Sequence, residues 1–352
     1  KVKFGAQATH HTFNPGAASV GFSDQEITLE NDARYAIELA GYTSFEYDFN
    51  DLLNIVVGVR YSGFNAIGPY KESVNDPITG APTLDTIKYS SWESIKWYDG
   101  FEPRFSFRYI TGENSSVKGS LTKNIQYLHL ASISGGTLPT DLWLPSSKYI
   151  KPQIAVQAAL GYFQNLKDNA YETSIEVFYK PMQNQIDFMP GANLFVAEEI
   201  DKNVLSGDGL AYGAEFFIKK NEGNLTGWIG YTWSKTTRTI PPLNNGNPYF
   251  PRYDRRHDGS VLATYKLNDQ WKFSAVFVFA TGIAYTPTVG RLFGDIGIEG
   301  SSPQDIMPFF DIISIYPDEY NGERLIPYHR GDISVIFNPK SKKERVWTGE
   351  WN

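Results

Sequence analysis

The stretch Arg34–Phe49, RYAIELAGYTSFEYDF, shows an alternation that decides the fold of this chain. Its odd positions are mostly aromatic or aliphatic, whereas its even positions include arginine, glutamate, serine and aspartate. A period of two is typical of a β-strand with one apolar face, because successive side chains point to opposite sides of a sheet. Soluble strands usually run for about 5 to 6 residues. This stretch is much longer, and it is long enough to cross a bilayer at a tilt.

The same period recurs along the whole chain. It is clear at the chain start, Lys1–Gly5, and it is most regular in 117–127, 172–180 and 271–281. It is also present in 53–61, 103–109, 153–162, 211–219, 227–233, 260–266 and 332–337. A last strand is predicted from Val346 to the chain end, and no stretch shows a helical period over three turns. The sequence therefore predicts an all-β, antiparallel fold of about 13 long strands.

The connections between these strands alternate in length. Short polar turns are predicted at 50–51, 111–115, 166–169, 221–224 and 268–269. Long irregular segments rich in Pro, Gly, Asn and aromatic residues are predicted near 65–100, 129–151, 183–209, 237–253 and 283–327. This alternation is typical of outer-membrane β-barrels, which have short periplasmic turns and long extracellular loops. Such barrels have even strand numbers in bacteria, so the odd count predicts a partial barrel, with 1–352 as part of a single barrel domain.

The composition is compatible with this prediction and excludes other classes. Hydrophobic residues make up 41% of the 352 residues, and no apolar run is long enough for a membrane helix. Aromatic residues reach 15%, which suits the girdles of a membrane barrel, although a soluble sandwich or propeller could use them too. The chain has no cysteine, so it has no disulfide, thiolate metal site or cysteine nucleophile. A net charge of −7, with one short basic run at Lys340–Lys343, argues against nucleic-acid binding.

An ordered series of motifs points to a family. The series reads FEPRFSFRY at 101–109, KGSLTKNIQYLH at 118–129, LPTDLW at 138–143, KPQ at 151–153, EVFYK at 176–180, GWIGYTWS at 227–234, YDRRHD at 253–258 and ATG at 280–282. In this order the motifs resemble the barrel of TonB-dependent receptors, and the resemblance covers most of the chain. It implies a plugged outer-membrane transporter of roughly 22 strands.

The resemblance also implies function and partners. Such receptors take up scarce nutrients that are too large for porins, among them siderophores, corrinoid vitamins, oligosaccharides and peptides. The energy comes from the TonB–ExbB–ExbD system through a plug domain, and a surface lipoprotein can be a further partner beside the outer-membrane lipid. No plug domain or TonB-contacting segment precedes Lys1, and the last barrel strands do not follow Asn352, so we expect both in the whole protein.

Ligand contacts are expected where strands run into the long loops. Polar and aromatic residues at these places are the candidates: Gln126, His129, Asp141, Trp143, Arg252 and Arg255. The arginines of the cluster 252–258 could pair with a phosphate or carboxylate, or the cluster could neutralise itself. His10 and His11 are adjacent in a strand and point to opposite faces, so they cannot bind one metal together. Asp168 and Asn224 lie at short turns and should touch no substrate.

Three functions remain open at this stage. The energised receptor is favoured by the resemblance and the long loops, and a passive porin-like channel is the alternative. An outer-membrane enzyme is disfavoured, because the sequence has no nucleophile elbow with Ser, His and Asp, and no Gly-rich phosphate loop. We predict no catalytic residues, no resident cofactor and no metal site.

The barrel prediction has a consequence for side-chain exposure. The apolar side of each strand should face lipid, and therefore look exposed, rather than fill a closed core. The outward set is Leu121, Ile125, Val177, Tyr179, Ala275 and Phe277, and the inward set is Ser120, Gln126 and Glu176.

Overall fold

One large antiparallel sheet of twelve strands makes up most of the structure. The computed structural model describes residues 1–14, 17–22, 25–30, 33–75, 82–131, 142–188, 200–288, 290–295, 310–315 and 319–339. The sheet strands follow in chain order: β1 (Val2–Phe13), β4 (Arg34–Asp48), β5 (Leu53–Ile67), β8 (Ser94–Gly112), β9 (Ser115–Gln126), β12 (Gln153–Leu166), β13 (Tyr171–Phe188), β14 (Val204–Lys220), β15 (Leu225–Thr239), β16 (His257–Lys266), β17 (Trp271–Ala280) and β22 (Tyr328–Phe337). Each of these strands matches a predicted one, so the all-β antiparallel prediction is confirmed. The thirteenth predicted strand, from Val346, lies outside the described residues.

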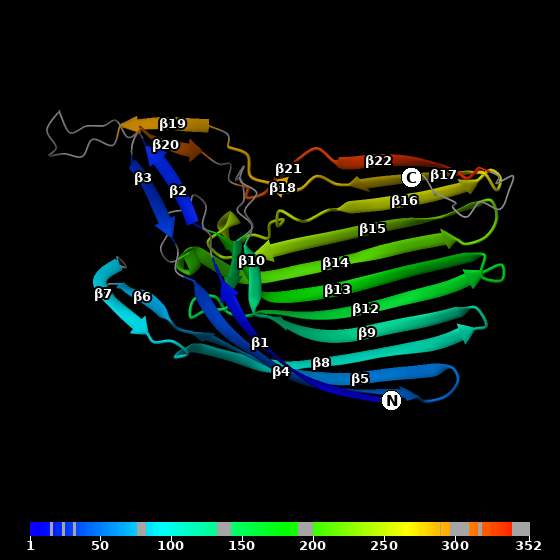
Figure 1. Cartoon of the computed structure of the whole chain (residues 1–352), viewed down its shortest axis with the longest axis horizontal. Coiled ribbons are helices and arrows are strands. Elements are labelled where there is room, and N and C mark those ends of the chain that lie inside the picture. The colour runs from blue at the N-terminus through cyan, green and yellow to red at the C-terminus, as the bar shows by residue number, and fades with distance from the viewer. Residues whose placement is uncertain are drawn as a thin grey trace.

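The short turns and the long connections lie at opposite ends of the sheet (Figure 1). We call these the turn end and the loop end. Local side chains close the turns: the Asn50 carboxamide oxygen accepts hydrogen bonds from the backbone N–H groups of Leu52 and Leu53, at 2.9 and 2.8 Å. At the turn from β12 to β13, Lys167, Asp168 and Asn169 all have positive φ, which lets the chain reverse within four residues. The predicted alternation of short and long connections is confirmed.

The long connections are not irregular throughout, which corrects the sequence prediction. They contain five small two-stranded sheets and two 3₁₀ turns in the described residues. These are β2 (Ala17–Phe22) with β3 (Gln25–Glu30), β6 (Tyr70–Asn75) with β7 (Pro82–Tyr89), β10 (Leu128–Ala131) with β11 (Leu142–Pro145), β18 (Ala284–Tyr285) with β21 (Glu323–Arg324), β19 (Gly290–Asp295) with β20 (Phe310–Ile315), and the turns η1 (Ile200–Asn203) and η2 (Asn244–Gly246). Strands of two to eight residues repeat the period too few times to stand out in a sequence.

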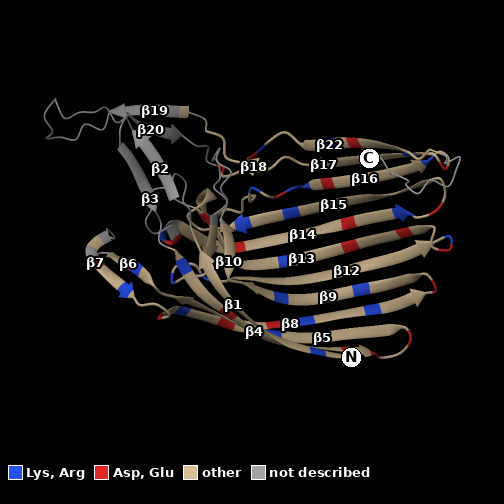
Figure 2. Cartoon of the chain, in the orientation of Figure 1, with Lys and Arg blue, Asp and Glu red and all other residues tan. Residues whose placement is uncertain are grey.

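The strand faces have the polarity predicted for a membrane barrel. Val177 and Tyr179 on β13 are 47% and 54% exposed, and Phe277 on β17 is 49% exposed. Leu121 and Ala275 are also exposed. Ile125 is half-buried and packs against the buried cluster that contains Phe64 and Tyr127, so five of the six residues are exposed as predicted. The strand ribbons carry few charged positions (Figure 2). Among the described residues, no helix is long and apolar enough to cross a membrane.

The segment after β9 folds back across the inner face of the sheet at the loop end. Its first residue, Tyr127, is buried and stacks on Phe64 of β5, with ring centroids 5.2 Å apart and planes 8° from parallel. The Tyr127 hydroxyl lies 2.9 Å from the hydroxyl of Ser62, which in turn donates to Glu102 at 2.7 Å. The hairpin that follows has β10 beside β13 and β11 beside β1. Those two strands are separated in the sheet by β4, β5, β8, β9 and β12, so the hairpin bridges the concave side of a curved sheet.

Candidate functional site

A row of residues across five strands forms the floor of a cavity on this inner face. Strand pairing puts Asn124 of β9 opposite Ala155 of β12, Met182 of β13 opposite Gly209 of β14, and Gly209 opposite Arg238 of β15. Ala155 also pairs with Met182, which makes the row continuous. Two of its five members carry almost no side chain. Four of the five residues line the cavity, whereas the space next to Gly209 is occupied by the Met182 and Gln185 side chains.

The cavity above this row has a volume of about 360 Å³. Gln126 and Leu130 come from β9 and β10, whereas Arg252 and Tyr253 come from the connection between β15 and β16. Asn321, from the connection before β21, completes the rim. Three long connections therefore converge with the strand ends around a single space. Its volume falls in the range of small-molecule sites, about 300–1,000 Å³.

A β-bulge in β13 shapes one wall. The register with β14 shifts between Met182 and Gln185, and Asn184 within the bulge has a φ of 56°. Bulges commonly redirect a side chain beside a functional site. Here the bulge brings the Gln185 amide to within 3.2 Å of the Gln153 side-chain oxygen, to which it donates. Two carboxamides are thus fixed side by side in the wall.

Arg238 is held in place by partners on three sides. Its Nη1 donates to the Ile186 carbonyl at 2.7 Å and lies 3.6 Å from an Asp187 carboxylate oxygen. Its Nη2 donates to the Tyr253 hydroxyl at 2.9 Å. The Tyr249 hydroxyl donates to the same Asp187 at 2.9 Å. This network ties the connection between β15 and β16 to the end of β13 and fixes the cavity wall.

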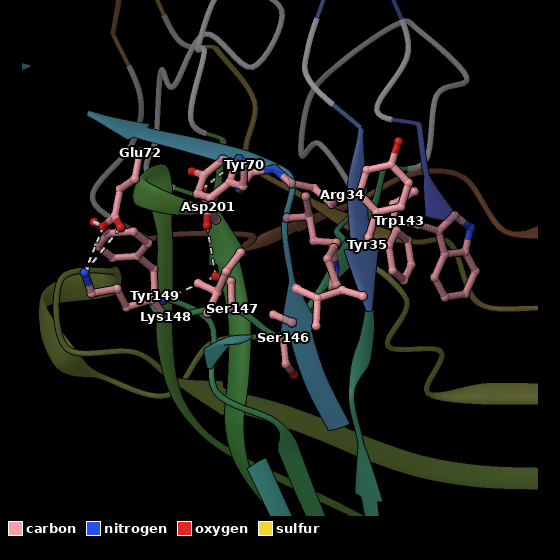
Figure 3. A pocket seen from close by; sticks show the side chains of 16 residues that line it. Arg34, Tyr35, Tyr70, Glu72, Trp143, Ser146, Ser147, Lys148, Tyr149 and Asp201 are labelled. Carbon is pink, nitrogen blue, oxygen red and sulfur yellow. Dashed lines mark hydrogen bonds and ion pairs between the residues drawn. The ribbon is translucent and has the colours of Figure 1, made fainter. Parts of the chain in front are cut away.

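A second, smaller cavity lies at the loop end, between the β10–β11 hairpin and the ends of β1, β4 and β5. It has a volume of about 50 Å³ and is lined by Trp143 and other aromatic residues. Charged groups around it are paired (Figure 3). Lys148 lies 3.0 Å from Glu72, the Tyr149 hydroxyl donates to Glu72 at 2.6 Å, and Arg34 lies 3.6 Å from Asp201. Burial raises the pKa of Glu72, but the hydrogen bonds from Tyr149, Lys148 and Tyr89 outweigh it and hold this pKa below its usual value.

His129 is part of β10 in the hairpin, and it is fully buried. Its Nε2 is 3.0 Å from the Ser146 hydroxyl, and its Nδ1 has no hydrogen-bond partner among the described residues. Burial lowers its pKa from the ordinary 6.5 to about 4. The imidazole is therefore neutral at physiological pH, and it joins β10 to the segment after β11.

A buried carboxylate ties together the connections on the far side of the cavity. Asp254 is 1% exposed and accepts a hydrogen bond from the Thr236 backbone N–H at 2.6 Å. It also pairs with Arg256 at 3.5 Å and with Arg324 of β21. Arg324 Nη1 donates further to the Gly282 carbonyl at 3.1 Å. Arg256 and Arg324 thus neutralise Asp254.

Comparison with known proteins identifies the family. The family model described as "TonB dependent receptor-like, beta-barrel" matches residues 4–321. The chain belongs to this TonB-dependent receptor family. No curated protein sequence matches it. The resemblance seen in the motifs is therefore confirmed for the barrel portion.

Solved structures show the same fold at low sequence identity. The ferric-catecholate import receptor Fiu from K12 E. coli is 14% identical with a TM-score of 0.56, and 97% of this chain covers 46% of that one. The ferric yersiniabactin uptake receptor FyuA from Yersinia pestis is 14% identical with a TM-score of 0.58, with coverage of 96% and 43%. The copper transporter OprC is 8% identical with a TM-score of 0.58, with coverage of 96% and 46%. The chain spans less than half of the length of these proteins.

A barrel of the TonB-dependent receptor family is an integral protein of the outer membrane, which explains the exposed apolar side of the sheet. Within this barrel the predicted ligand residues differ in the cavity that they line. Gln126 and Arg252 line the larger cavity together, and Trp143, 53% exposed, lines the smaller one. Arg255 lines neither cavity and lies 3.8 Å from Asp258. Asp141 lies outside the described residues.

Several cavity residues were missed by sequence reasoning. They are Asn124, Gln153, Lys180, Gln185, Asp187, Arg238 and Tyr253. Asn124 stands on the polar side of β9 near the end next to a long connection, and Lys180 is the last residue of the predicted strand 172–180, so both positions were an available signal. The bulge that directs Gln185 inward leaves no comparable mark in the sequence. No group of three or more His, Asp or Glu side chains in the described part of the chain is placed to hold a metal ion.

Proposed function

We propose that this chain is part of the barrel of a receptor that takes up a scarce nutrient across the outer membrane with energy from TonB–ExbB–ExbD. The observation that carries the proposal is the cavity at the loop end, where three long connections meet the strands around Gln126 and Arg252. Membership of the family supports it, and so does the fold shared with import receptors and a copper transporter. The nutrient is a siderophore, vitamin, oligosaccharide or peptide.

The partners and the domain organisation follow from the same proposal. The segment 1–352 is part of a single barrel domain, and a plug domain elsewhere in the whole protein contacts TonB. Outer-membrane lipid surrounds the apolar outer face, and a surface lipoprotein is a further candidate partner at the loop end. The chain acts by binding and transport rather than by covalent catalysis.

Transport assays with loop-end and turn-end variants test this function. Gln126→Ala, Trp143→Ala and Arg252→Ala should weaken nutrient capture, because truncating a contact residue costs about 1 kcal/mol, roughly fivefold in affinity. Asp168→Ala and Asn224→Ala, at the turn end, are matched controls that should take up nutrient normally. Insertion is checked by the heat-dependent gel mobility of the folded barrel. Uptake lost only in the turn-end variants contradicts the site.

The energy source is tested separately. Uptake should stop when TonB is deleted, whereas binding of the nutrient at the cell surface should persist. Uptake that continues without TonB identifies a passive channel, which was the alternative left open by the sequence.

A further inference from the structure

The larger cavity differs in charge from the chain as a whole. The chain has a net charge of −7, yet the cavity is lined by Lys180, Arg238 and Arg252 with Asp187 as its one acidic side chain. Basic positions are visible on β13 and toward the loop-side end of β15 (Figure 2). A concave site of one sign, with low-dielectric walls, concentrates ions of the opposite sign. The cavity therefore favours an anion.

Lys180 differs from other cations of the inner face in its surroundings. Arg60 lies 3.2 Å from Glu38 and 3.5 Å from Glu102, and Lys148 lies 3.0 Å from Glu72. Lys180 is half-buried and has no carboxylate within ion-pair distance among the described residues. Since a half-buried ammonium loses part of its hydration, a ligand carboxylate would be a favourable partner.

The cavity also holds an unusual number of carboxamides. Asn124, Gln126, Gln153 and Gln185 all line it. A carboxamide both donates and accepts hydrogen bonds, as a hydroxyl group does, so adjacent amides match a ligand with several hydroxyls. A simple inorganic anion would need only the cations and would leave this amide wall unused.

An open aromatic ring borders the same space. Tyr253 is 54% exposed, and the Arg238 guanidinium carbon lies 5.2 Å from its ring centroid. The hydroxyl of Tyr253 is engaged with Arg238, so the exposed remainder of the residue is mainly the ring. Such a ring suits the C–H face of a sugar or another compact organic group.

We propose that this cavity is a selectivity site for a polyhydroxylated carboxylate, such as a sugar acid. Lys180 binds the carboxylate, and the carboxamides bind the hydroxyls. The cavity volume of about 360 Å³ accommodates a group of this size. The inference rests on the proposed uptake function and adds the class of ligand to it.

Binding to the intact receptor in detergent tests the proposal without TonB. Calorimetric titration compares glucuronate and gluconate with glucose, which lacks the carboxylate, and with acetate, which lacks the hydroxyls. At least one of the two acids should bind about tenfold more tightly than both glucose and acetate. The acid that binds more tightly shows whether the site prefers a cyclic or an open-chain sugar acid. Equal binding of glucose and both acids, or no measurable binding of either acid, overturns the proposal.

Matched lysine variants assign the selectivity to this cavity. Lys180→Met should remove most of the preference for the acid, and Lys180→Arg should keep it because the charge remains. Lys118→Met is the control, since Lys118 is on the same side of β9 as Asn124 but does not line the cavity. Folding is checked by heat-dependent gel mobility. A preference that survives in Lys180→Met contradicts the proposal.

The failures of the two proposals are distinguishable. If TonB-dependent uptake is lost in the loop-end variants while both acids fail to bind, the uptake function stands and the ligand class is wrong. If an acid binds through Lys180 but the receptor imports nothing when TonB is present, the site stands and the transport function is wrong.

Discussion

At the scale of the residue, His129 is the most informative side chain of the loop end. It is fully buried, and its pKa is lowered to about 4 because burial disfavours the charged imidazolium. The neutral form is therefore the one that the fold stabilises. This stability is complete above the unfolded-state pKa of about 6.5 and is lost as the pH falls toward 4. Over that window we expect the β10–β11 hairpin to lose up to about 3 kcal/mol of local stability.

Hydrogen exchange measures this loss. Amide protection factors for 128–130 and 143–150 should fall between pH 7 and pH 4.5, after correction for the intrinsic exchange rate. The variant His129→Gln cannot take up a proton at these pH values, so its protection should change little over the same interval. A wild-type hairpin whose protection is the same at both pH values contradicts the expected role of His129.

At the scale of the element, Asp254 connects two long connections that pack on β15. Asp254→Asn removes the carboxylate that neutralises Arg256 and Arg324, and breaking one partner of a buried ion pair costs about 3–5 kcal/mol. We expect β18 and β21 to become sensitive to protease while the twelve-stranded sheet stays protected. The control is Asp258→Asn, because its pair with Arg255 is 46% exposed on both sides and contributes at most about 1 kcal/mol. Equal proteolysis of both variants contradicts this role of Asp254.

The same scale shows what the sequence could predict. Strands such as β4 and β13 repeat their alternation many times, so they were found from the pattern alone. The four-residue strands β10 and β11 were not, because two repeats do not distinguish a strand from a loop. The sequence predicts Gln126 and Arg252 as ligand contacts because they lie where strands run into long loops. That they line a common cavity depends on strand register and on how the long connections fold back, which no local pattern reveals.

At the scale of the whole molecule, the curved sheet separates an apolar outer face from a polar inner one. The outer row of β13 contains Ile175, Val177 and Tyr179, all exposed, while Glu176 between them is half-buried on the other side. A soluble sheet would cover such a row, because apolar side chains are stabilised by removal from water. In the outer membrane, lipid covers it instead, so the same alternation produces stability without a closed core.

Spin labels at neighbouring positions test this arrangement in the intact receptor. Residues 1–352 contain no cysteine, so Val177→Cys and Glu176→Cys each give this part of the receptor a single labelling site, and any cysteine elsewhere in the receptor is replaced first. In lipid vesicles, a label at position 177 should collide mainly with dissolved oxygen, which concentrates in the bilayer. A label at position 176 should collide mainly with a water-soluble nickel chelate, because the inner face is wet. Phe277→Cys on β17 should behave like Val177→Cys, since both rows face outward. A label at position 177 that is more accessible to the chelate than the label at position 176 contradicts the orientation of the sheet and, with it, the barrel.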